Sequence, residues 1–581
     1  MSKLLFGVHM HQPVGNSFEV IQKAVNECYF PFFNTIKDFN FKFAFHSSGW
    51  ILEIIKNDFP KLFEIIKNLA QKGNIEFFTG GFYEPILPII PSSDRLVQIK
   101  KLNNFLFENF GVKPKGLWLT ERVWDYSILK DIVKSGIEYI MVDDFHLQAS
   151  GYEEIEGYYI TENEGEILKL IPISQELRYS IPFDELSSSI AKITSKKYAI
   201  MFDDLEKFGM WPNSYEWCYK KNWLKKFFAK MENLSIHFQD FISNTKPISL
   251  AYIQNLSYPE MQKWCLKADK YIKYKDNQYF KGCIWKNFFN KYPESNYLHK
   301  RMLEISKQKK SENLYKLQDN DVFWHGVFGG IYLGILRENS YKYLLLAEKE
   351  IDRKNLTIKD IDLDGYDEII VKNNKFFILF NHKGEIVEFS DLISLNNYQN
   401  MVSRKKEGYF FEAPKKKKNN GLASIHEISL DKPDDLIFDR YLRYSFIVYE
   451  IFEDFSKTTF FEDNFTKKEI SFNYTDKLNF ISDEVTKKFK INEKLFFEIT
   501  TNKKIAIELN FYGEHINKED FFSNEIILDN LIIQLDKPCQ IFAFELFTYS
   551  KTEMGYQKEF QGVSISIITN KTIKGYIDVR D

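Results

Sequence analysis

Short apolar runs recur through the first 250 residues, and stretches with helical spacing separate them. The runs span residues 4–9, 43–46, 75–79, 116–120, 139–142, 167–173, 198–202 and 248–253. Residues 50–59 form one clear helical stretch, because their apolar positions recur at the spacing of a helix face. Strand, helix and strand in repetition predict a parallel sheet of the α/β class, and seven or eight such units favour a closed barrel.

The pattern changes after residue 255. Residues 258–273 and 298–307 are periodic and charged, which predicts helices. A glycine-rich turn at 320–330 carries Asp321 and Trp324 and separates two helical segments. From about residue 350 onward, short alternating runs with turn residues between them are typical of a β-sandwich.

Composition narrows the classes of function. The chain has 581 residues, and its 81 acids and 78 bases leave a net charge of −3, which gives no electrostatic case for binding nucleic acid. Its five cysteines form no Cys-x-x-Cys pair, so we expect neither a thiolate zinc site nor a disulfide framework. The first apolar run is too short for a signal peptide, and no run approaches membrane-spanning length. We therefore expect a cytoplasmic protein without a membrane partner.

Two of the apolar runs end in acids. Glu121 and Arg122 follow the run at 116–120, and Asp203, Asp204, Glu206 and Lys207 follow the run at 198–202. The carboxyl ends of parallel strands meet on one face of a barrel, where such folds place their chemistry. Two carboxylates from two strand ends are what cleavage of a glycosidic bond needs. The alternative is that these acids form structural ion pairs with the neighbouring Arg122 and Lys207.

Five separated motifs then agree in order with one family. They are His11-Gln-Pro13, Gly80-Gly-Phe-Tyr-Glu-Pro85, Trp118-Leu-Thr-Glu-Arg-Val123, Phe202-Asp-Asp-Leu-Glu-Lys-Phe-Gly209 and Leu256-Ser-Tyr-Pro-Glu-Met-Gln-Lys-Trp264. Together they resemble glycoside hydrolase family 57, and within it the branch of 4-α-glucanotransferases and α-amylases. Residues 324–330 and 404–409 also resemble this branch, so the resemblance covers almost the whole chain.

The resemblance implies an α/β fold with an incomplete seven-stranded parallel (β/α) barrel, a helical region and a C-terminal antiparallel β-sandwich. We expect the barrel, as catalytic domain, at residues 1–255, the helical region that completes the active site at 256–348, and the sandwich at 349–581. The implied reaction is a retaining double displacement on α-1,4-glucans or maltooligosaccharides, with no organic cofactor and no metal. A homodimer is left open.

The resemblance also assigns roles to residues. Glu121 falls on the nucleophile and Asp204 on the acid/base. The positions that resemble those lining the donor sugar subsites are His9, His11, Glu84, Trp118, Glu206, Trp211, Asp321 and Trp324. The roles agree with elementary electrostatics: Arg122 and the histidines would keep Glu121 ionised, whereas the acids beside Asp204 would raise its pKa and keep it protonated.

One position departs from the family pattern. Leu205 stands where the fourth motif usually has a small residue, and a branched side chain there would narrow the site or lower activity. The favoured function is 4-α-glucanotransferase, since the helical and β regions resemble that branch. An α-amylase and a catalytically weak glucan-binding protein on the same scaffold are the alternatives.

Two metal sites are also considered. Asp143, Asp144 and His146, with the N-terminal histidines, could ligate zinc as in a polysaccharide deacetylase, but that function leaves Glu121 and Asp204 without a joint role. Asp360, Asp362 and Asp364 resemble the start of an EF-hand calcium loop. Val371 occupies the position of the distal glutamate, so an acidic turn is favoured there.

Overall fold

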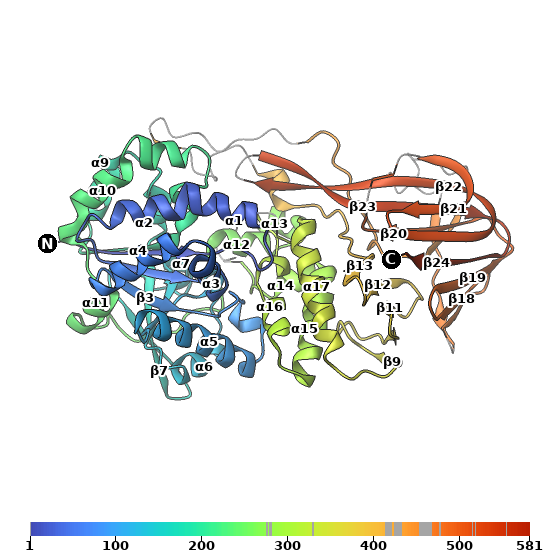
Figure 1. Ribbon diagram of the computed structural model, residues 1–581, viewed down its shortest axis with the longest axis horizontal. Coiled ribbons are helices and arrows are strands. Elements are labelled where there is room, and N and C mark those ends of the chain that lie inside the picture. Colours follow the sequence, from blue (N-terminus) through green and yellow to red (C-terminus); the bar gives the residue numbers. More distant parts are fainter. Residues whose placement is uncertain are drawn as a thin grey trace.

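The computed structural model describes residues 2–580 except 275–276, 278–279, 281, 328–329, 413–420, 423–432, 452–466, 476–477, 514, 517–518 and 553–554. The molecule is elongated, with the barrel at one end, antiparallel sheets at the other and a block of helices between them (Figure 1). In the part of the chain so described, no helix combines the length and the hydrophobicity that crossing a bilayer requires.

The barrel lies within residues 2–255, all of which are described. Its parallel strands are β1 (Lys3–Met10), β2 (Phe43–Ser47), β3 (Ile75–Thr79), β4 (Gly116–Leu117), β5 (Tyr139–Asp143), β7 (Glu166–Ile173) and β8 (Tyr198–Asp204). They pair in the order β7-β5-β4-β3-β2-β1-β8, while β7 and β8 share no ladder. The predicted incomplete seven-stranded barrel is therefore confirmed.

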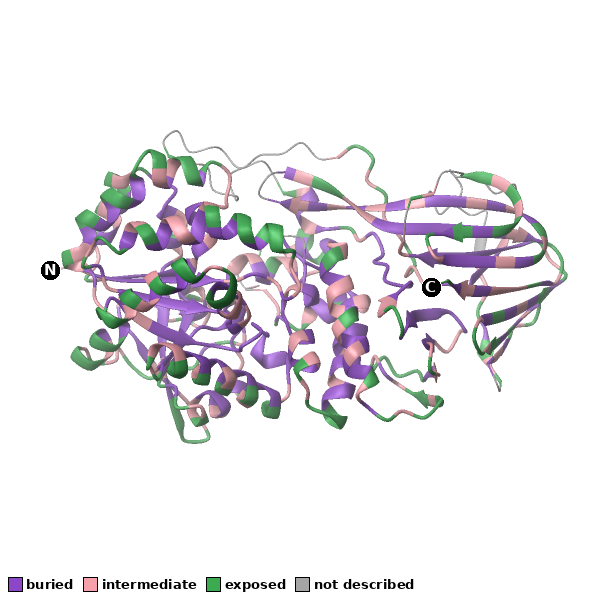
Figure 2. Cartoon of the chain, viewed as in Figure 1, coloured by how far each residue is buried: buried purple, intermediate pink, exposed green. Residues whose placement is uncertain are grey.

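Helices cover the outside of the barrel, with buried inner and exposed outer faces (Figure 2). They are α1 (Phe18–Ala24), α2 (Phe30–Ile36), α3 (Gly49–Asp58), α4 (Pro60–Gln71), α5 (Ser92–Phe110), α6 (Leu129–Lys134), α7 (Asp144–Ala149), α8 (Gln175–Ser180), α9 (Leu186–Thr194), α10 (Trp223–Met231) and α11 (Phe238–Asn244). The apolar strands are buried on both faces, as a parallel sheet requires.

The strand expected at residues 248–253 does not form. This segment makes a single bridge, Leu250 to Ile160, and Leu250 and Tyr252 are about half exposed, so it is not buried as a barrel strand would be. The edge strand is instead β6 (Tyr159–Asn163), which pairs antiparallel with β7.

The helical region contains α12 (Pro259–Trp264), α13 (Ala268–Tyr274), α14 (Asn287–Lys291), α15 (Pro293–Gln308), α16 (Glu312–Leu317) and α17 (Gly334–Lys349). Arg301 of α15 is fully buried and is held by Glu348 of α17 at 2.9 Å and by Glu388 of the neighbouring sheet at 3.3 Å. A fully buried guanidinium must be paired, so these contacts fix the helices against the sheet.

The C-terminal part packs two antiparallel sheets around one apolar core, which confirms the predicted sandwich. The first comprises β9 (Leu356–Lys359), β10 (Glu368–Lys372), β11 (Phe376–Phe380), β12 (Ile386–Asp391) and β13 (Asn396–Asn397). The second comprises β14 (Ile447–Ile451), β15 (Lys467–Glu469), β16 (Asn473–Tyr474), β17 (Asn479–Ile481), β18 (Val485–Ile491), β19 (Leu495–Thr501), β20 (Ile505–Phe511), β21 (Asp520–Leu528), β22 (Leu531–Thr552), β23 (Gly555–Thr569) and β24 (Ile573–Val579).

Candidate active site

A cavity of about 280 Å³ opens at the carboxyl ends of the barrel strands, against the helical region. Parallel pairing aligns the carboxyl ends of neighbouring strands. His9 of β1 is in register with His46 of β2 on one side and with Asp204 of β8 on the other. The structure brings together in the cavity wall His9, His11, Trp118, Glu121, Asp204, Glu206, Trp211, Asp321 and Trp324. Glu84, the remaining predicted residue, is buried behind the wall against His9.

Glu121 lies just after β4, in the left-handed backbone region at φ 51°. Its Oε2 accepts a hydrogen bond of 2.6 Å from the Tyr258 hydroxyl, and its carbonyl accepts one from the Ser257 hydroxyl. Burial raises the pKa of Glu121 to about 7, although Arg122 and Tyr258 act in the opposite direction. The charge of Arg122 thus acts in the expected direction, by favouring the ionised form of Glu121, but burial has the larger effect on the pKa.

Asp204 ends β8 beside a fixed negative charge. Burial raises the pKa of Asp204, and the charge of Asp203 raises it further. Burial also disfavours the Asp203 carboxylate, but Arg178 at 3.0 Å and Lys207 at 2.5 Å hold the pKa of Asp203 well below its usual range. The charge of Asp203 therefore raises the pKa of Asp204 in the direction that the sequence analysis expects.

His11 and Glu206 form a second polar group on the wall. The Nε2 atom of His11 lies 2.9 Å from Oδ2 of Asp321. Burial opposes protonation, but the hydrogen bond and the charge of Asp321 raise the pKa of His11 to about 10. Glu206 Oε1 accepts hydrogen bonds from the Tyr29 hydroxyl and from the His11 amide, and burial raises its pKa to about 7.

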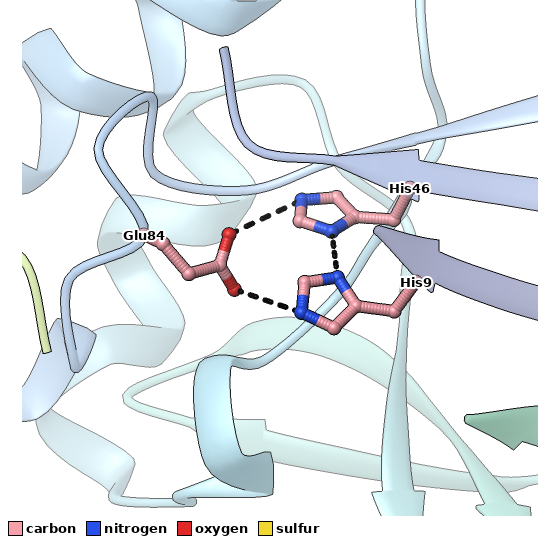
Figure 3. A group of neighbouring side chains, drawn as sticks. All are labelled: His9, His46 and Glu84. Atoms are coloured by element: carbon pink, nitrogen blue, oxygen red, sulfur yellow. Dashed lines mark hydrogen bonds and ion pairs between the residues drawn. The ribbon is translucent and has the colours of Figure 1, made fainter. Parts of the chain in front are cut away.

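His9 of the cavity wall forms a buried group with His46 and Glu84 (Figure 3). The Nδ1 atoms of the two histidines are 2.8 Å apart, and the Glu84 oxygens lie 3.8 Å from His9 Nε2 and 4.0 Å from His46 Nε2. Burial lowers the pKa of both histidines and raises that of Glu84 to about 7. His46, fully buried, was not among the predicted site residues.

This group has three ligand atoms within 4.8 Å of one another, as a metal site would. The hydrogen-bond geometry argues against a metal held by all three residues. When the Nδ1 atoms of two neutral rings share a hydrogen bond, one ring donates from Nδ1 and the other accepts there, so the accepting ring carries its single nitrogen-bound proton on Nε2. If both Nε2 atoms bound a metal, both Nδ1 atoms would carry protons and would face each other at 2.8 Å.

The zinc site of a deacetylase does not form either. The ring nitrogens of His146 lie 3.1 Å and 3.0 Å from the carbonyl oxygens of Asp143 and Leu256, and neither faces the cavity. The Asp143 carboxylate accepts from Arg178 at 2.9 Å. These side chains are therefore engaged with the protein.

The tryptophans of the cavity wall differ in their exposure and in the rings on which they stack. Trp118 is 2% exposed, and its ring stacks on His9 at 4.7 Å, so it supports the wall more than it faces a ligand. Trp211 is partly exposed and stacks on Phe183 at 5.4 Å. Trp324 lies parallel to Trp264 with ring centroids 6.1 Å apart, and both line the cavity.

Leu205 does not narrow the site. It is fully buried in the core of the barrel and its helices, away from the cavity wall. The chain turns into a 3-10 helix at Leu205–Phe208 directly after β8. This turn places Leu205 in the core and Glu206 in the cavity.

Several wall residues were missed by the sequence analysis. Tyr258 contacts Glu121, Arg178 holds Asp203, and Trp264 pairs with Trp324. Tyr258 and Trp264 belong to the fifth motif, so the motif itself could have indicated that they line the cavity. Arg178 lies in α8 outside every motif, and only the fold brings it to the site.

The acidic turn before β10 closes on itself. Gly365 donates its amide to Asp360, Asp364 to Asp362, and Ile361 to Glu368. One ligand atom each from Asp360, Asp362 and Glu368 lies within 4.8 Å of the others. Glu368, the ninth position of the loop counted from Asp360, was not among the predicted ligands, because an EF-hand has its distal glutamate at the twelfth position.

Comparison with known proteins agrees with this geometry. The model of glycosyl hydrolase family 57 matches residues 5–254, and those of the middle and C-terminal domains of alpha-amylase/4-alpha-glucanotransferase match 283–351 and 360–527. A 4-alpha-glucanotransferase of Thermococcus kodakarensis is 33% identical over 98% of this chain and 97% of its own. An alpha-amylase of Pyrococcus furiosus is 33% identical over 96% of each chain.

A solved structure extends the likeness to three dimensions. The 4-alpha-glucanotransferase from Thermococcus litoralis superposes on this chain with a TM-score of 0.88, at 30% identity and over the full length of both. The order of the motifs, the incomplete barrel and the sequence identity all lead to one assignment. The chain belongs to glycosyl hydrolase family 57.

Proposed function

We propose that this protein is a retaining 4-α-glucanotransferase that passes maltooligosaccharide segments from one α-1,4-glucan to another. The observation that carries the proposal is the placement of Glu121 and Asp204 in one cavity with different surroundings. Tyr258 orients the Glu121 carboxylate, whereas burial and the fixed charge of Asp203 raise the pKa of Asp204 and so favour its protonated form. Relatives of this length and identity bear the name 4-alpha-glucanotransferase, which supports the same assignment.

The two carboxyl groups divide the reaction between them. Glu121, when ionised, attacks the anomeric carbon while Asp204 gives its proton to the leaving glycosidic oxygen. Asp204 then takes a proton from the hydroxyl of an incoming glucan, which attacks the glycosyl-enzyme and releases Glu121. Since Tyr258 already holds the Glu121 carboxylate, little rearrangement is needed before the attack.

Hydrolysis of α-1,4-glucans is the second candidate, because an alpha-amylase shares the same 33% identity. Incubation with maltotriose, followed by chromatography of the products, separates the two. A transferase yields both longer and shorter chains with an almost constant number of reducing ends. If all products are shorter than the substrate and the number of reducing ends rises with each cleavage, the protein is an α-amylase and not a transferase.

We further propose that residues 1–255 act as the catalytic domain, that 256–348 complete the cleft, and that 349–581 form the sandwich domain. The contribution of Asp321 and Trp324 to the cavity supports this division. A cytoplasmic location is proposed as well, to be tested by cell fractionation. Sedimentation measurements will decide between a monomer and a homodimer.

A further inference from the structure

Two cysteines lie next to each other near the cavity, since one of them, Cys265, directly follows the wall residue Trp264. The Sγ atoms of Cys265 and Cys283 are 2.7 Å apart, although the residues are 18 positions apart in the sequence. This separation is closer than two unbonded sulfur atoms normally approach and is within about 0.7 Å of the length of a disulfide bond.

The two thiols differ in a way that suits stepwise oxidation. Cys265 is fully buried, and burial raises the pKa of its thiol. Cys283 is partly exposed, and the hydrogen bond with Cys265 and the ammonium of Lys291 lower the pKa of its thiol. Cys283 is therefore the thiol that a reagent in solution reaches, and it is also the better nucleophile of the two.

The position of the pair connects it with the wall. Cys265 directly follows Trp264 at the end of α12, and Trp264 stacks on Trp324 in the cavity. The Trp264 carbonyl accepts a hydrogen bond of 2.7 Å from Lys291, and the Cys265 carbonyl accepts one of 2.6 Å from Asn287. Any constraint on Cys265 thus acts on the backbone that carries Trp264.

We propose that Cys265 and Cys283 form a reversible disulfide, by exchange with small-molecule disulfides, that fixes the Trp264 side of the glucan cavity. The Cys283 thiolate attacks one sulfur of the small disulfide, a mixed disulfide forms, and one thiolate leaves. Cys265 loses its proton to water and attacks the Cys283 sulfur, and the second small thiolate leaves. Two protein thiols are oxidised while one small disulfide is reduced to two thiols.

Such a pair suits a thiol-reducing compartment, where protein disulfides are usually transient and responsive to redox conditions. Closing the loop restricts the unfolded chain, so the oxidised protein gains stability. It also limits the motion of Trp264 before a glucan binds. The effect on glucan binding rests on the proposed function, whereas the cross-link does not.

The test uses the full chain in buffers that contain either oxidised or reduced glutathione. Remaining thiols are alkylated, and the digested protein is analysed by mass spectrometry. We expect a linked peptide joining Cys265 to Cys283 in oxidised samples only, with a melting temperature about 3 °C above that of the reduced protein. Maltoheptaose, followed by tryptophan fluorescence, should bind the oxidised form about threefold more tightly.

Three variants make the outcome decisive. Cys265→Ser should retain glutathione on Cys283, because the resolving thiol is gone, and Cys283→Ser should take up little glutathione. Cys539→Ser, which changes a thiol in the distant sandwich, should behave as the unaltered protein does. If Cys265 and Cys283 both remain open to alkylation after oxidation, or if cross-linking leaves maltoheptaose affinity unchanged, the proposal is wrong. Absence of maltoheptaose binding in both redox states would instead count against the proposed function. The disulfide itself would still be tested by the linked peptide in the mass spectrum.

Discussion

The imidazole Nε2 of His11 lies 2.9 Å from the carboxylate of Asp321, although 310 positions separate the two residues. His11 follows β1 of the barrel, and Asp321 begins the 3-10 turn Asp321–Phe323 in the helical region. The contact therefore joins the two parts of the chain that form the cavity. Because the pKa of His11 is about 10, the contact is an ion pair at neutral pH.

Replacing Asp321 should weaken the link in a pH-dependent way. The folded pKa of His11 is raised above its unfolded value near 6.5, so the stabilisation is complete below about pH 6.5 and is lost as the pH rises through about 10. Asp321→Asn should cost about 2 kcal/mol of unfolding free energy at pH 6 and much less at pH 10.5. Urea denaturation at both pH values measures the difference.

The matched control for this variant is Asp240→Asn. Asp240 pairs with Lys42 at 3.6 Å on the surface, where both side chains are about half exposed. Such pairs contribute little, so this variant should lose almost nothing at either pH. Equal losses at the two pH values for Asp321→Asn would show that His11 does not carry the effect.

The two carboxyl groups should respond differently to removal of their charge. Glu121→Gln should lower turnover on every α-glucan by about a thousandfold or more, which is about 4 kcal/mol of barrier, because no glycosyl-enzyme can form. Asp204→Asn should lower turnover on natural glucans by a similar factor, because their leaving group needs a proton. An α-glycosyl fluoride needs little protonation, so with it the Asp204→Asn variant should accumulate the intermediate on Glu121, visible by mass spectrometry.

Azide provides the control for these roles. It needs no general base, so it should rescue Asp204→Asn and give a product that keeps the α configuration, while Glu121→Gln should show no such product. A β-configured product from the unaltered enzyme would indicate an inverting reaction. If both variants kept activity within about tenfold, roughly 1.4 kcal/mol, neither assignment would hold.

The alkaline side of the pH profile should depend on Asp203. Its charge raises the pKa of Asp204, and its removal also leaves Arg178 and Lys207 less compensated, which lowers that pKa further. In Asp203→Asn, Asp204 should therefore lose its proton at lower pH. We expect the alkaline limb of kcat/KM to move down by about 1 pH unit.

Asp143→Asn is the comparison for this shift. Asp143 also accepts from Arg178 at 2.9 Å, but it does not directly raise the pKa of Asp204. In Asp143→Asn, the alkaline limb of kcat/KM should move by less than half of the shift expected for Asp203→Asn. Circular dichroism on both variants checks that the fold is intact, and an unmoved limb in Asp203→Asn would show that another group sets it.

Trp211 is expected to retain the acceptor glucan. Its partly exposed ring lies on the cavity wall, supported by Phe183. Trp211→Ala should raise the ratio of hydrolysis to transfer, since water reaches the intermediate more easily, with the melting temperature almost unchanged. Trp217→Ala removes a tryptophan that donates to the Pro182 carbonyl outside the cavity wall, so it should lower stability and leave the ratio unchanged. If Trp211→Ala lowers the melting temperature and leaves the ratio of hydrolysis to transfer unchanged, Trp211 is a packing residue and does not retain the acceptor.

Motifs and strand periodicity were sufficient to predict the barrel, the sandwich and most of the cavity wall, because they depend on local residue patterns. Contacts between distant segments were not predictable. His46 reaches His9 only through the pairing of β1 with β2, and Arg178 reaches Asp203 only through the packing of α8 on β8. The β6–β7 hairpin turns at Glu164-Gly165, which have positive φ at both positions as a tight hairpin turn requires, and only the glycine is a sign of that turn in the sequence.

Leu205 shows why motif comparison alone misjudged a side chain. A strand that continued would alternate its residues between the two faces, whereas the 3-10 turn after Asp204 rotates Leu205 into the core. The turn is a property of the backbone, so the residue type at position 205 did not reveal it.

Glu84, Glu121 and Arg122 hold the chain at φ values of 53°, 51° and 49°, where glycine would be the relaxed choice. Each side chain there costs about 1 kcal/mol of backbone strain. Selection for thermal tolerance alone would therefore favour Glu121→Gly, a replacement that relieves the backbone and removes the carboxylate that we propose as nucleophile. Engineering for heat resistance should exclude these positions, since stability gained there is activity lost.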